Sequence, residues 1–283
     1  MARFRYAAQF SQEFIRPCWY VVPPHTKIEI GMKYFRLLVI WALSINIHAA
    51  EEVIEGIYSS NNINGSILIE SGDGKIKYQY NVDKEESYVP ASTFKIPNTL
   101  IILEEGLIKD SSELIPWDGV QREYAPWNKD QNLKTAFQYS CVWCYQRYAK
   151  KVGDIKYQEY LRNFNYGNQL TGSEITRFWL DGDLRVSIKD QISFLRKLYA
   201  ESLPIEKQHM KTLKSIMLSE SNSQMKVWSK TGWSGKDGWY VGYLVVNEKT
   251  WFFANHIEIN QRSDLALRKK LTMDTFKVLK ILR

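Results

Sequence analysis

Strand-like patterns open and close this chain, whereas its middle shows helical periodicity. Short apolar and β-branched runs bounded by turn residues predict strands near the start, at residues 52–58, 65–70 and 76–80. The same kind of run predicts strands near the end, at residues 225–230, 239–246 and 250–257. Apolar residues three and four positions apart predict a final helix at residues 265–282.

The middle of the chain predicts a block of helices. Apolar residues recur at helical spacing in four windows, at residues 95–106, 140–152, 155–164 and 188–199. Gly106, Gly153 and Gly167 lie where three of these helices would end. The order predicts an α+β fold, in which both ends of the chain build one antiparallel sheet with flanking helices and an all-helical lobe is inserted at about residues 90–210. A cleft between sheet and lobe is the expected place for a site.

Residues 32–50 differ from the rest of the chain. They read MKYFRLLVIWALSINIHAA, with Lys33 and Arg36 before a short apolar run and small residues after it. This is the pattern of a secretory signal peptide, and the run is shorter than the ~20 residues of a membrane span. Residues 1–31 resemble neither a signal peptide nor the start of a fold, so we expect Met32 to be the initiator and residues 1–31 to be a non-native upstream extension. The expected product is a single domain at residues 51–283, in the bacterial periplasm or secreted, without stable membrane insertion.

Net charge gives little support for a polyanionic partner. The 283 residues carry +7, but residues 1–31 and 32–50 each carry +2, which leaves +3 for residues 51–283. The chain also contains no run of five Lys or Arg residues. We therefore expect a solvated, mildly basic surface and no nucleic-acid partner.

Histidine and cysteine are scarce after residue 50. His209 and His256 lie in no recognisable motif, which disfavours a zinc centre and a Ser-His-Asp triad, and no metal is expected. Cys141 and Cys144 form a C-x-x-C pair, which in isolation suggests a redox or metal pair. Their helical, apolar surroundings favour two small buried hydrophobic residues instead.

The stretch PASTFKIP, residues 90–97, holds the first candidate for catalysis. Ser92 and Lys95 would lie one helical turn apart, at a helix start where free N–H groups favour a developing oxyanion. The alternative is that Ser92 is an ordinary N-cap. A second S-x-x-K pair, Ser223 and Lys226, leads into a predicted strand, where residues three apart point to opposite faces. We therefore interpret the second pair as incidental.

Two further motifs follow the first in sequence order. Ser140-Cys141-Val142 begins a helical run, and Lys230-Thr231-Gly232 lies in a predicted strand. The order S-x-x-K, S-x-[N/V], K-T-G is typical of penicillin-recognising serine acyltransferases. In such enzymes the first motif supplies a nucleophile with an amine base, the second a hydroxyl that relays protons, and the third a strand whose cation and backbone hold the substrate.

The exact residues of these motifs, together with two further motifs, resemble one family. Besides S-T-F-K, S-x-V and K-T-G-W, the chain contains Tyr166-Gly167-Asn168 and Phe178-Trp179-Leu180. Together these resemble the class D (oxacillinase-type, OXA-like) serine β-lactamases over essentially all of residues 51–283. The E-x-x-L-N motif of another β-lactamase class is missing, and Val142 stands where transpeptidases usually have Asn.

The resemblance implies that Ser92 is the acylated nucleophile and Lys95 the general base. In that family the lysine is a carboxylysine formed with CO2 or bicarbonate, and no other cofactor is expected. A lysine must be neutral to react with CO2, so burial must lower its pKa from ~10.4. Phe94 would contribute to that burial, and the carbamate pocket would comprise Val142, Trp179, whose indole N–H would donate to the carbamate, and Leu180.

The remaining roles follow from the same resemblance. Ser140 would pass a proton to the β-lactam nitrogen, and Lys230 would favour that transfer and attract the substrate carboxylate. The guanidinium of Arg268 would grip the carboxylate. The oxyanion hole would consist of the backbone N–H groups of Ser92 and Trp233, and the other substrate contacts would be Thr231 and Gly232.

The implied activity is hydrolysis of penicillin-type β-lactams, which confers antibiotic resistance. The main alternative is a non-hydrolytic β-lactam sensor, which would share the fold but normally ends a multi-span membrane protein; a transpeptidase is a third. Residues 233–239 leave a short loop after K-T-G, so the substrate range stays open. The sequence also leaves a homodimer open. Cys141 and Cys144 flank Val142, and their oxidation is expected to perturb the site.

Overall fold

The computed structural model describes residues 49–83 and 86–283. The predicted upstream extension and nearly all of the predicted signal peptide lie outside these described residues. Residues 49–60 form a helix, so the strand predicted at residues 52–58 is wrong. Ile54 and Tyr58 are buried on one side of this helix, whereas Val53 is exposed. This spacing is helical, but over so short a stretch it cannot be distinguished from the alternation of a strand.

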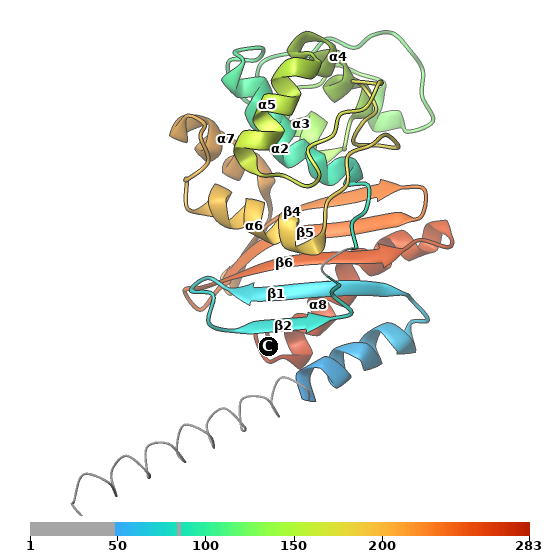
Figure 1. Cartoon of the computed structure of the whole chain (residues 1–283), viewed down its shortest axis with the longest axis vertical. Coiled ribbons are helices and arrows are strands. Elements are labelled where there is room, and N and C mark those ends of the chain that lie inside the picture. Colours follow the sequence, from blue (N-terminus) through green and yellow to red (C-terminus); the bar gives the residue numbers. More distant parts are fainter. Residues whose placement is uncertain (1–48, 84–85) are drawn as a thin grey trace, which may run out of the picture. The chain divides into compact units, whose positions relative to one another are not determined.

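The described strands form one antiparallel sheet in the order β2-β1-β6-β5-β4-β3 (Figure 1). β1 comes from the start of the described chain and pairs along its whole length with β6 from the end, as predicted. The bounds are β1 (Gly65–Ser71), β2 (Lys77–Tyr80), β3 (Leu218–Ser221), β4 (Met225–Ser234), β5 (Asp237–Val246) and β6 (Lys249–Glu258).

Helices cover both faces of the sheet and form a separate group beyond its β4 side (Figure 1). The α-helices are α2 (Lys95–Glu104), α3 (Leu133–Gln138), α4 (Val142–Val152), α5 (Asp154–Phe164), α6 (Ile188–Tyr199), α7 (Lys207–Met217) and α8 (Leu267–Val278). Short 3-10 helices occur at η1 (Ala91–Phe94), η2 (Ala125–Trp127) and η3 (Arg262–Ala266). The α+β prediction with an inserted helical lobe is therefore confirmed. None of the described helices is long and apolar enough to cross a bilayer.

Alternation along the strands produces two hydrophobic cores. In β1, Leu68 faces the core that contains α6 and the helical lobe, whereas Ile67 and Ile69 face the core under α8 and residues 49–60. Both faces of β1 are therefore buried, which explains why this strand is almost continuously apolar.

Periodicity missed α3, α7 and β3 and misplaced some ends. α3 has six residues, too few for a clear helical period. α4 begins at Val142 because Ser140 has a φ of +54° and Cys141 is the N-cap. Gly153 ends α4 with a φ of +78°, as predicted.

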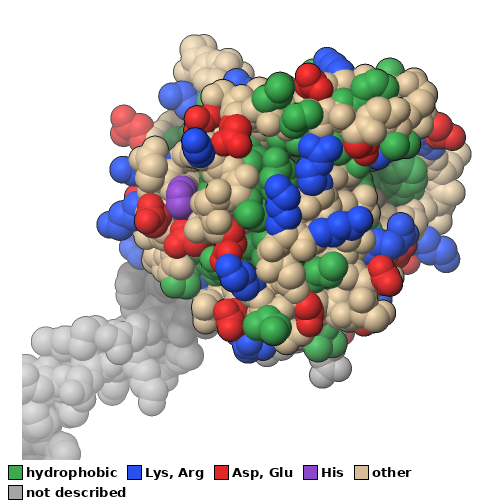
Figure 2. All heavy atoms as spheres, turned by 90° about the horizontal axis from the view of Figure 1, so that it is seen from above, with side chains coloured by type: hydrophobic (Ala, Val, Ile, Leu, Met, Phe, Trp, Pro, Cys, Tyr) green, Lys and Arg blue, Asp and Glu red, His purple; other side chains and the backbone are tan. Residues whose placement is uncertain are grey.

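Charged side chains of both signs are interspersed with apolar ones on the face shown in Figure 2. Exposed pairs such as Arg177 with Asp181 and Lys269 with Glu220 each contribute little to stability. The mixture agrees with the net charge of +3 calculated for residues 51–283.

Candidate active site

Ser92 and Lys95 lie where η1 runs into α2. Nζ of Lys95 is 3.2 Å from Oγ of Ser92, and both residues are buried. The N-caps of η1 and α2 are Pro90 and Phe94, so the alternative of Ser92 as a helix N-cap is wrong. Ala91 has a φ of +50°, a region that residues with a β-carbon rarely adopt. Such local strain directly before a candidate nucleophile is typical of functional sites.

The surroundings of Lys95 disfavour its charged form. It is fully buried, and burial first and the charge of Lys230 second lower its pKa well below the usual value. Its near neighbours are the hydroxyl of Ser92 and the ring of Tyr145, whose centroid lies 4.9 Å from Nζ. No carboxylate of the described chain forms an ion pair with it, so a free amine is available as a base.

The aromatic residues predicted around Lys95 come together. Phe94 stacks on Trp179 with centroids 5.6 Å apart, and Phe178 packs edge-on against the same indole at 4.9 Å. Trp179 is fully buried, yet its Nε1 has no hydrogen-bond partner among the described residues. Leaving a buried donor unpaired costs about 1–3 kcal/mol, so this N–H is prepared for an acceptor.

The other residues of the predicted carbamate pocket are Val142, which is half-buried, and Leu180. Val142 is the first residue of α4, and Leu180 packs partly buried against the core of the lobe. The carbonyl of Leu180 accepts a hydrogen bond from Ser234 at the end of β4. This bond ties the Phe-Trp-Leu segment to the strand that carries K-T-G.

The Tyr-Gly-Asn motif shapes the loop that leads to Trp179. Gly167 has a φ of +57°, and a β-carbon there would lie 2.2 Å from the carbonyl oxygen of Arg185, so only glycine fits. Asn168 bonds the carbonyl of Asp183 at 2.8 Å and accepts from the N–H of Arg185 at 3.0 Å. The motif therefore closes the loop that presents the Phe-Trp-Leu segment.

Ser140 and Lys230 form a second hydroxyl–amine pair. Nζ of Lys230 donates to Oγ of Ser140 at 2.6 Å and to the carbonyl of Thr231 at 3.0 Å. Burial, with a smaller contribution from the charge of Arg268, lowers the pKa of Lys230 to about 7. This amine can therefore exchange a proton near neutral pH.

Gly232 lets β4 approach the nucleophile. A β-carbon at this position would lie 2.9 Å from the carbonyl oxygen of Pro90 and 3.1 Å from Thr93. The strand therefore runs directly beside the turn that carries Ser92. Trp233, which follows on β4, is 46% exposed and leaves its backbone next to this contact.

Arg268 supports β4 from α8. Its Nη1 donates to the carbonyl of Gly232 at 2.6 Å and its Nε to that of Leu265 at 2.7 Å, and burial lowers its pKa to about 10. The guanidinium is thus fixed beside the K-T-G strand. No hydrogen bond joins its Nη2 to a described residue.

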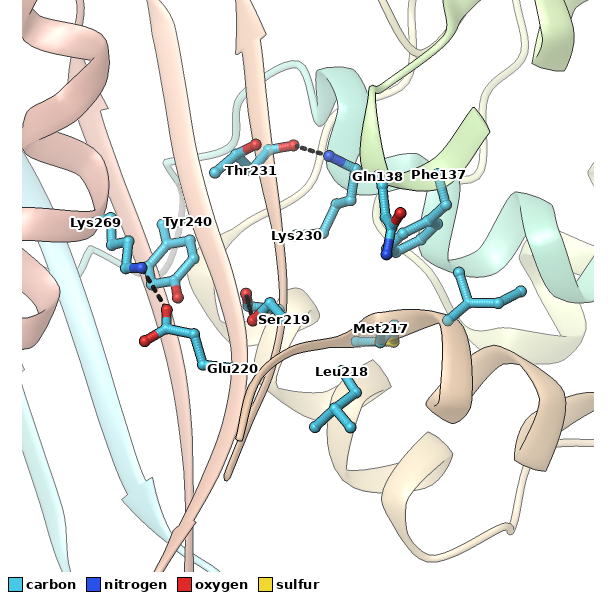
Figure 3. Close-up of a pocket in the computed structure, with 12 residues that line it drawn as sticks. Phe137, Gln138, Met217, Leu218, Ser219, Glu220, Lys230, Thr231, Tyr240 and Lys269 are labelled. Carbon is cyan, nitrogen blue, oxygen red and sulfur yellow. Dashed lines mark hydrogen bonds and ion pairs between the residues drawn. The ribbon is translucent and has the colours of Figure 1, made fainter. Parts of the chain in front are cut away.

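A cavity of about 340 Å³ lies beside Lys230 and along β4 (Figure 3). Lys230 and Thr231 line it, whereas Ser92, Lys95 and Ser140 do not, and apolar residues of α3, the end of α7 and the start of β3 form a wall. The second S-x-x-K pair lies elsewhere, with Ser223 and Lys226 both exposed, as predicted.

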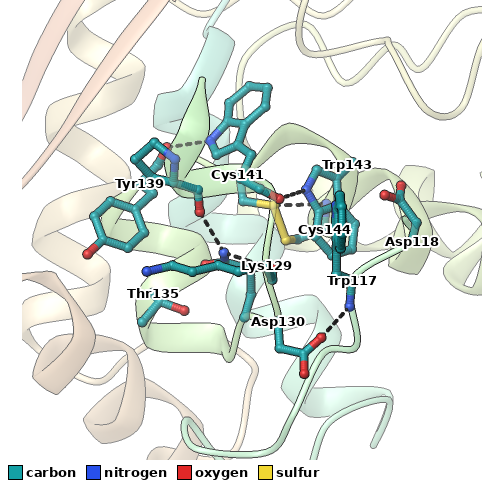
Figure 4. The surroundings of a disulfide bond; sticks show 12 residues. Trp117, Asp118, Lys129, Asp130, Thr135, Tyr139, Cys141, Trp143 and Cys144 are labelled. Atoms are coloured by element: carbon teal, nitrogen blue, oxygen red, sulfur yellow. Dashed lines mark hydrogen bonds between the residues drawn. A yellow bond between two sulfur atoms is a disulfide. The ribbon is translucent and has the colours of Figure 1, made fainter. Parts of the chain in front are cut away.

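Cys141 and Cys144 form a disulfide (Figure 4), which corrects the expectation of two separate small hydrophobic residues. Their burial was predicted correctly. The pair forms because Cys141 is the N-cap of α4 and Cys144 lies in its first turn, with Cα atoms 5.5 Å apart. Sequence alone cannot distinguish such a pair from two thiols.

Sequence reasoning missed Tyr145. It lies three residues after Val142 and therefore on the same face of α4, and it bonds Thr99 at 2.7 Å while its ring covers Lys95. The helical spacing from S-x-V was the signal that could have identified it.

A buried Ser–Lys pair, a second hydroxyl–lysine pair and a strand edge beside both define a serine acyltransferase of the penicillin-binding type. A family model described as "Penicillin binding protein transpeptidase domain" matches residues 57–277. β-Lactamase OXA-48 of Klebsiella pneumoniae is 40% identical over 201 residues, covering 70% of this chain and 76% of its own. OXA-20 of Pseudomonas aeruginosa is 37% identical, covering 79% and 88%.

Solved structures point to the same family. The class D β-lactamase YbXI from Nostoc superposes with a TM-score of 0.79 at 37% identity, covering 81% of this chain and 99% of its own. A class D β-lactamase from Sebaldella termitidis gives a TM-score of 0.77 at 40% identity, covering 81% and 96%. The chain belongs to the class D β-lactamase family.

Proposed function

We propose that this protein hydrolyses β-lactam antibiotics through an acyl-enzyme on Ser92 and thereby confers resistance. The observation that carries this proposal is the Ser92–Lys95 pair: a hydroxyl 3.2 Å from a fully buried amine whose pKa is lowered well below its usual value. An uncharged amine at that distance can accept the hydroxyl proton as the oxygen attacks.

In acylation, a bond forms between Oγ of Ser92 and the β-lactam carbonyl carbon, and the ring C–N bond breaks. Lys95 takes the proton of the hydroxyl, and Ser140 delivers a proton to the departing nitrogen. The 2.6 Å contact with Lys230 supports this relay, because an amine with a pKa of about 7 can replace the proton that Ser140 gives up.

The backbone N–H groups of Ser92 and Trp233 would stabilise the oxyanion. The close approach of Gly232 to Pro90 supports this placement, because it brings the backbone of β4 next to the turn before Ser92. The substrate carboxylate would lie beside Lys230, Thr231 and Arg268.

We further propose that Lys95 is carboxylated by CO2 and that the carbamate on Lys95 is the base that activates both Ser92 in acylation and the deacylating water. Three features of the site fit this group: a buried amine whose pKa is lowered, the nearby positive charge of Lys230, and the unpaired buried Nε1 of Trp179. The indole would donate to the carbamate, while Phe94 and Phe178 exclude water from its other side.

The predicted signal peptide at residues 32–50 supports action in the periplasm or outside the cell. β-Lactam antibiotics would then be met before they reach cell-wall synthesis.

Turnover of a chromogenic cephalosporin tests the proposal. The wild type should hydrolyse many equivalents, and Ser92→Ala should lose at least about 10³-fold in kcat/KM. A single stoichiometric burst without further hydrolysis would instead identify a β-lactam sensor.

A further inference from the structure

Ser140 lies at a sharp reversal of the chain between α3 and α4. Its φ of +54° is in the left-handed region, which residues with a β-carbon rarely adopt. The N–H of Ser140 bonds the carbonyl of Phe137 at 3.2 Å, and that of Cys141 bonds Ala136 at 2.8 Å. The surrounding structure must stabilise this conformation, because it is unfavourable for serine by itself.

The Cys141–Cys144 disulfide begins directly after Ser140 (Figure 4). It links the N-cap of α4 to the first turn, and Sγ of Cys141 also accepts the N–H of Cys144 at 3.3 Å. The covalent bond thus fixes the path of the chain as it leaves Ser140.

Trp127 connects the two sides of the reversal. Its Nε1 donates to the carbonyl of Tyr139 at 2.9 Å, and its own carbonyl accepts from Nε1 of Trp143 at 3.1 Å. Tyr139 precedes Ser140, and Trp143 lies within the disulfide loop. The disulfide and the hydrogen bonds of Trp127 in η2 therefore both hold the short segment around Ser140.

The disulfide is suited to a permanent role. Cys141 is 0% and Cys144 1% exposed. A thiol must reach a sulfur atom to exchange with it, so burial protects the bond in the folded protein.

Contrary to the expectation from the sequence that oxidation perturbs the site, we propose that the Cys141–Cys144 disulfide is a positioning element for catalysis: it holds the α3–α4 reversal so that Oγ of Ser140 stays within hydrogen-bond distance of Nζ of Lys230. The proposal rests on the relay role of Ser140 in the proposed function. Neither sulfur touches the substrate; they act through the hydroxyl that moves the proton.

The double variant Cys141→Ser/Cys144→Ala tests this, because it keeps an N-cap acceptor and removes only the covalent link. Acylation by a chromogenic cephalosporin, measured in single turnover, should slow about tenfold, while the substrate dissociation constant changes less than twofold. The matched control is Gly153→Ala at the other end of α4. Its φ of +78° makes alanine strained there, so it should lower Tm and leave acylation unchanged.

Wild-type acylation in the double variant, with only a lower Tm, would overturn the proposal. Ser140→Ala separates the two hypotheses. Unchanged acylation in Ser140→Ala would reject the relay itself, whereas slow acylation there with wild-type acylation in the double variant rejects only the positioning role.

If the double variant does not fold, the wild type can be unfolded and refolded with dithiothreitol, which is oxidised to its cyclic disulfide as Cys141 and Cys144 become thiols. Differential alkylation of the tryptic peptide 135–147 verifies their state. The reduced protein should show the same tenfold slower acylation, and a wild-type rate would reject the proposal.

Discussion

Lys95 and Lys230 are buried lysines whose pKa values are both lowered in the folded protein. Between the folded and unfolded pKa values the unfolded chain binds more protons, so the free energy of unfolding should rise with pH. For Lys230 this window runs from about 7 in the folded state to ~10.4 in the unfolded state.

Denaturant unfolding between pH 7 and pH 9 measures this linkage. The wild type should gain up to ~1.4 kcal/mol per pH unit from each lysine, and Lys230→Met should show a smaller slope. Lys226→Met, which removes an exposed lysine of the same strand, is the control and should keep the wild-type slope. Equal slopes in all three proteins would contradict the burial of an uncharged Lys230.

Trp179→Phe tests the unpaired indole N–H. The variant keeps a ring between Phe94 and Phe178 but removes the donor, so deacylation should slow at least about tenfold and acyl-enzyme should accumulate. A ¹³C NMR carbamate signal after addition of ¹³C-bicarbonate should weaken in parallel. Trp251→Phe, which changes an indole on β6, should alter neither; an unchanged carbamate signal in Trp179→Phe would contradict the predicted role.

At the residue scale the motifs pointed to side chains that the structure brings into pairs, Ser92 with Lys95 and Ser140 with Lys230, because their types and order are specific. Their catalytic roles stay predictions. The disulfide and the positive φ angles beside Ser92 and Ser140 could not be predicted, because they depend on how distant segments pack.

Among the elements, β4 determines the width of the site. Because a β-carbon on Gly232 would lie 2.9 Å from the carbonyl oxygen of Pro90, Gly232→Ala should push the strand away from Ser92. We expect kcat/KM to fall at least about tenfold with a smaller change in Tm. Gly56→Ala, in the helix of residues 49–60 with no atom within 4 Å of the added carbon, should leave activity unchanged. Full activity of Gly232→Ala would show that this contact is dispensable.

Hydrophobic periodicity predicted the long elements well and the short elements poorly. β4, β5, β6 and α6 were found, although the predicted strand windows covered only six to eight of the ten residues in each strand. Residues 49–60 were assigned wrongly because tertiary packing of Ile54 and Tyr58, not a long period, defines that helix.

At the scale of the whole molecule, β1 from the start of the described chain pairs with β6 from its end in one sheet. The predicted signal peptide at residues 32–50 leads us to expect a mature protein of residues 51–283. Intact-mass measurement of the natural protein from a periplasmic fraction should give a product without residues 1–50. Detection of residues 1–31 would contradict the predicted upstream extension.

Mass spectrometry of the protein quenched during reaction with benzylpenicillin tests the central claim most directly. The account predicts a mass increase of one intact penicillin on the peptide that contains Ser92, transient in the wild type. In Lys95→Ala the label should form more slowly, because Lys95 also takes the Ser92 proton in acylation, and should then persist, because the base for deacylation is lost. Label on another residue, or undiminished hydrolysis by Ser92→Ala, would contradict it.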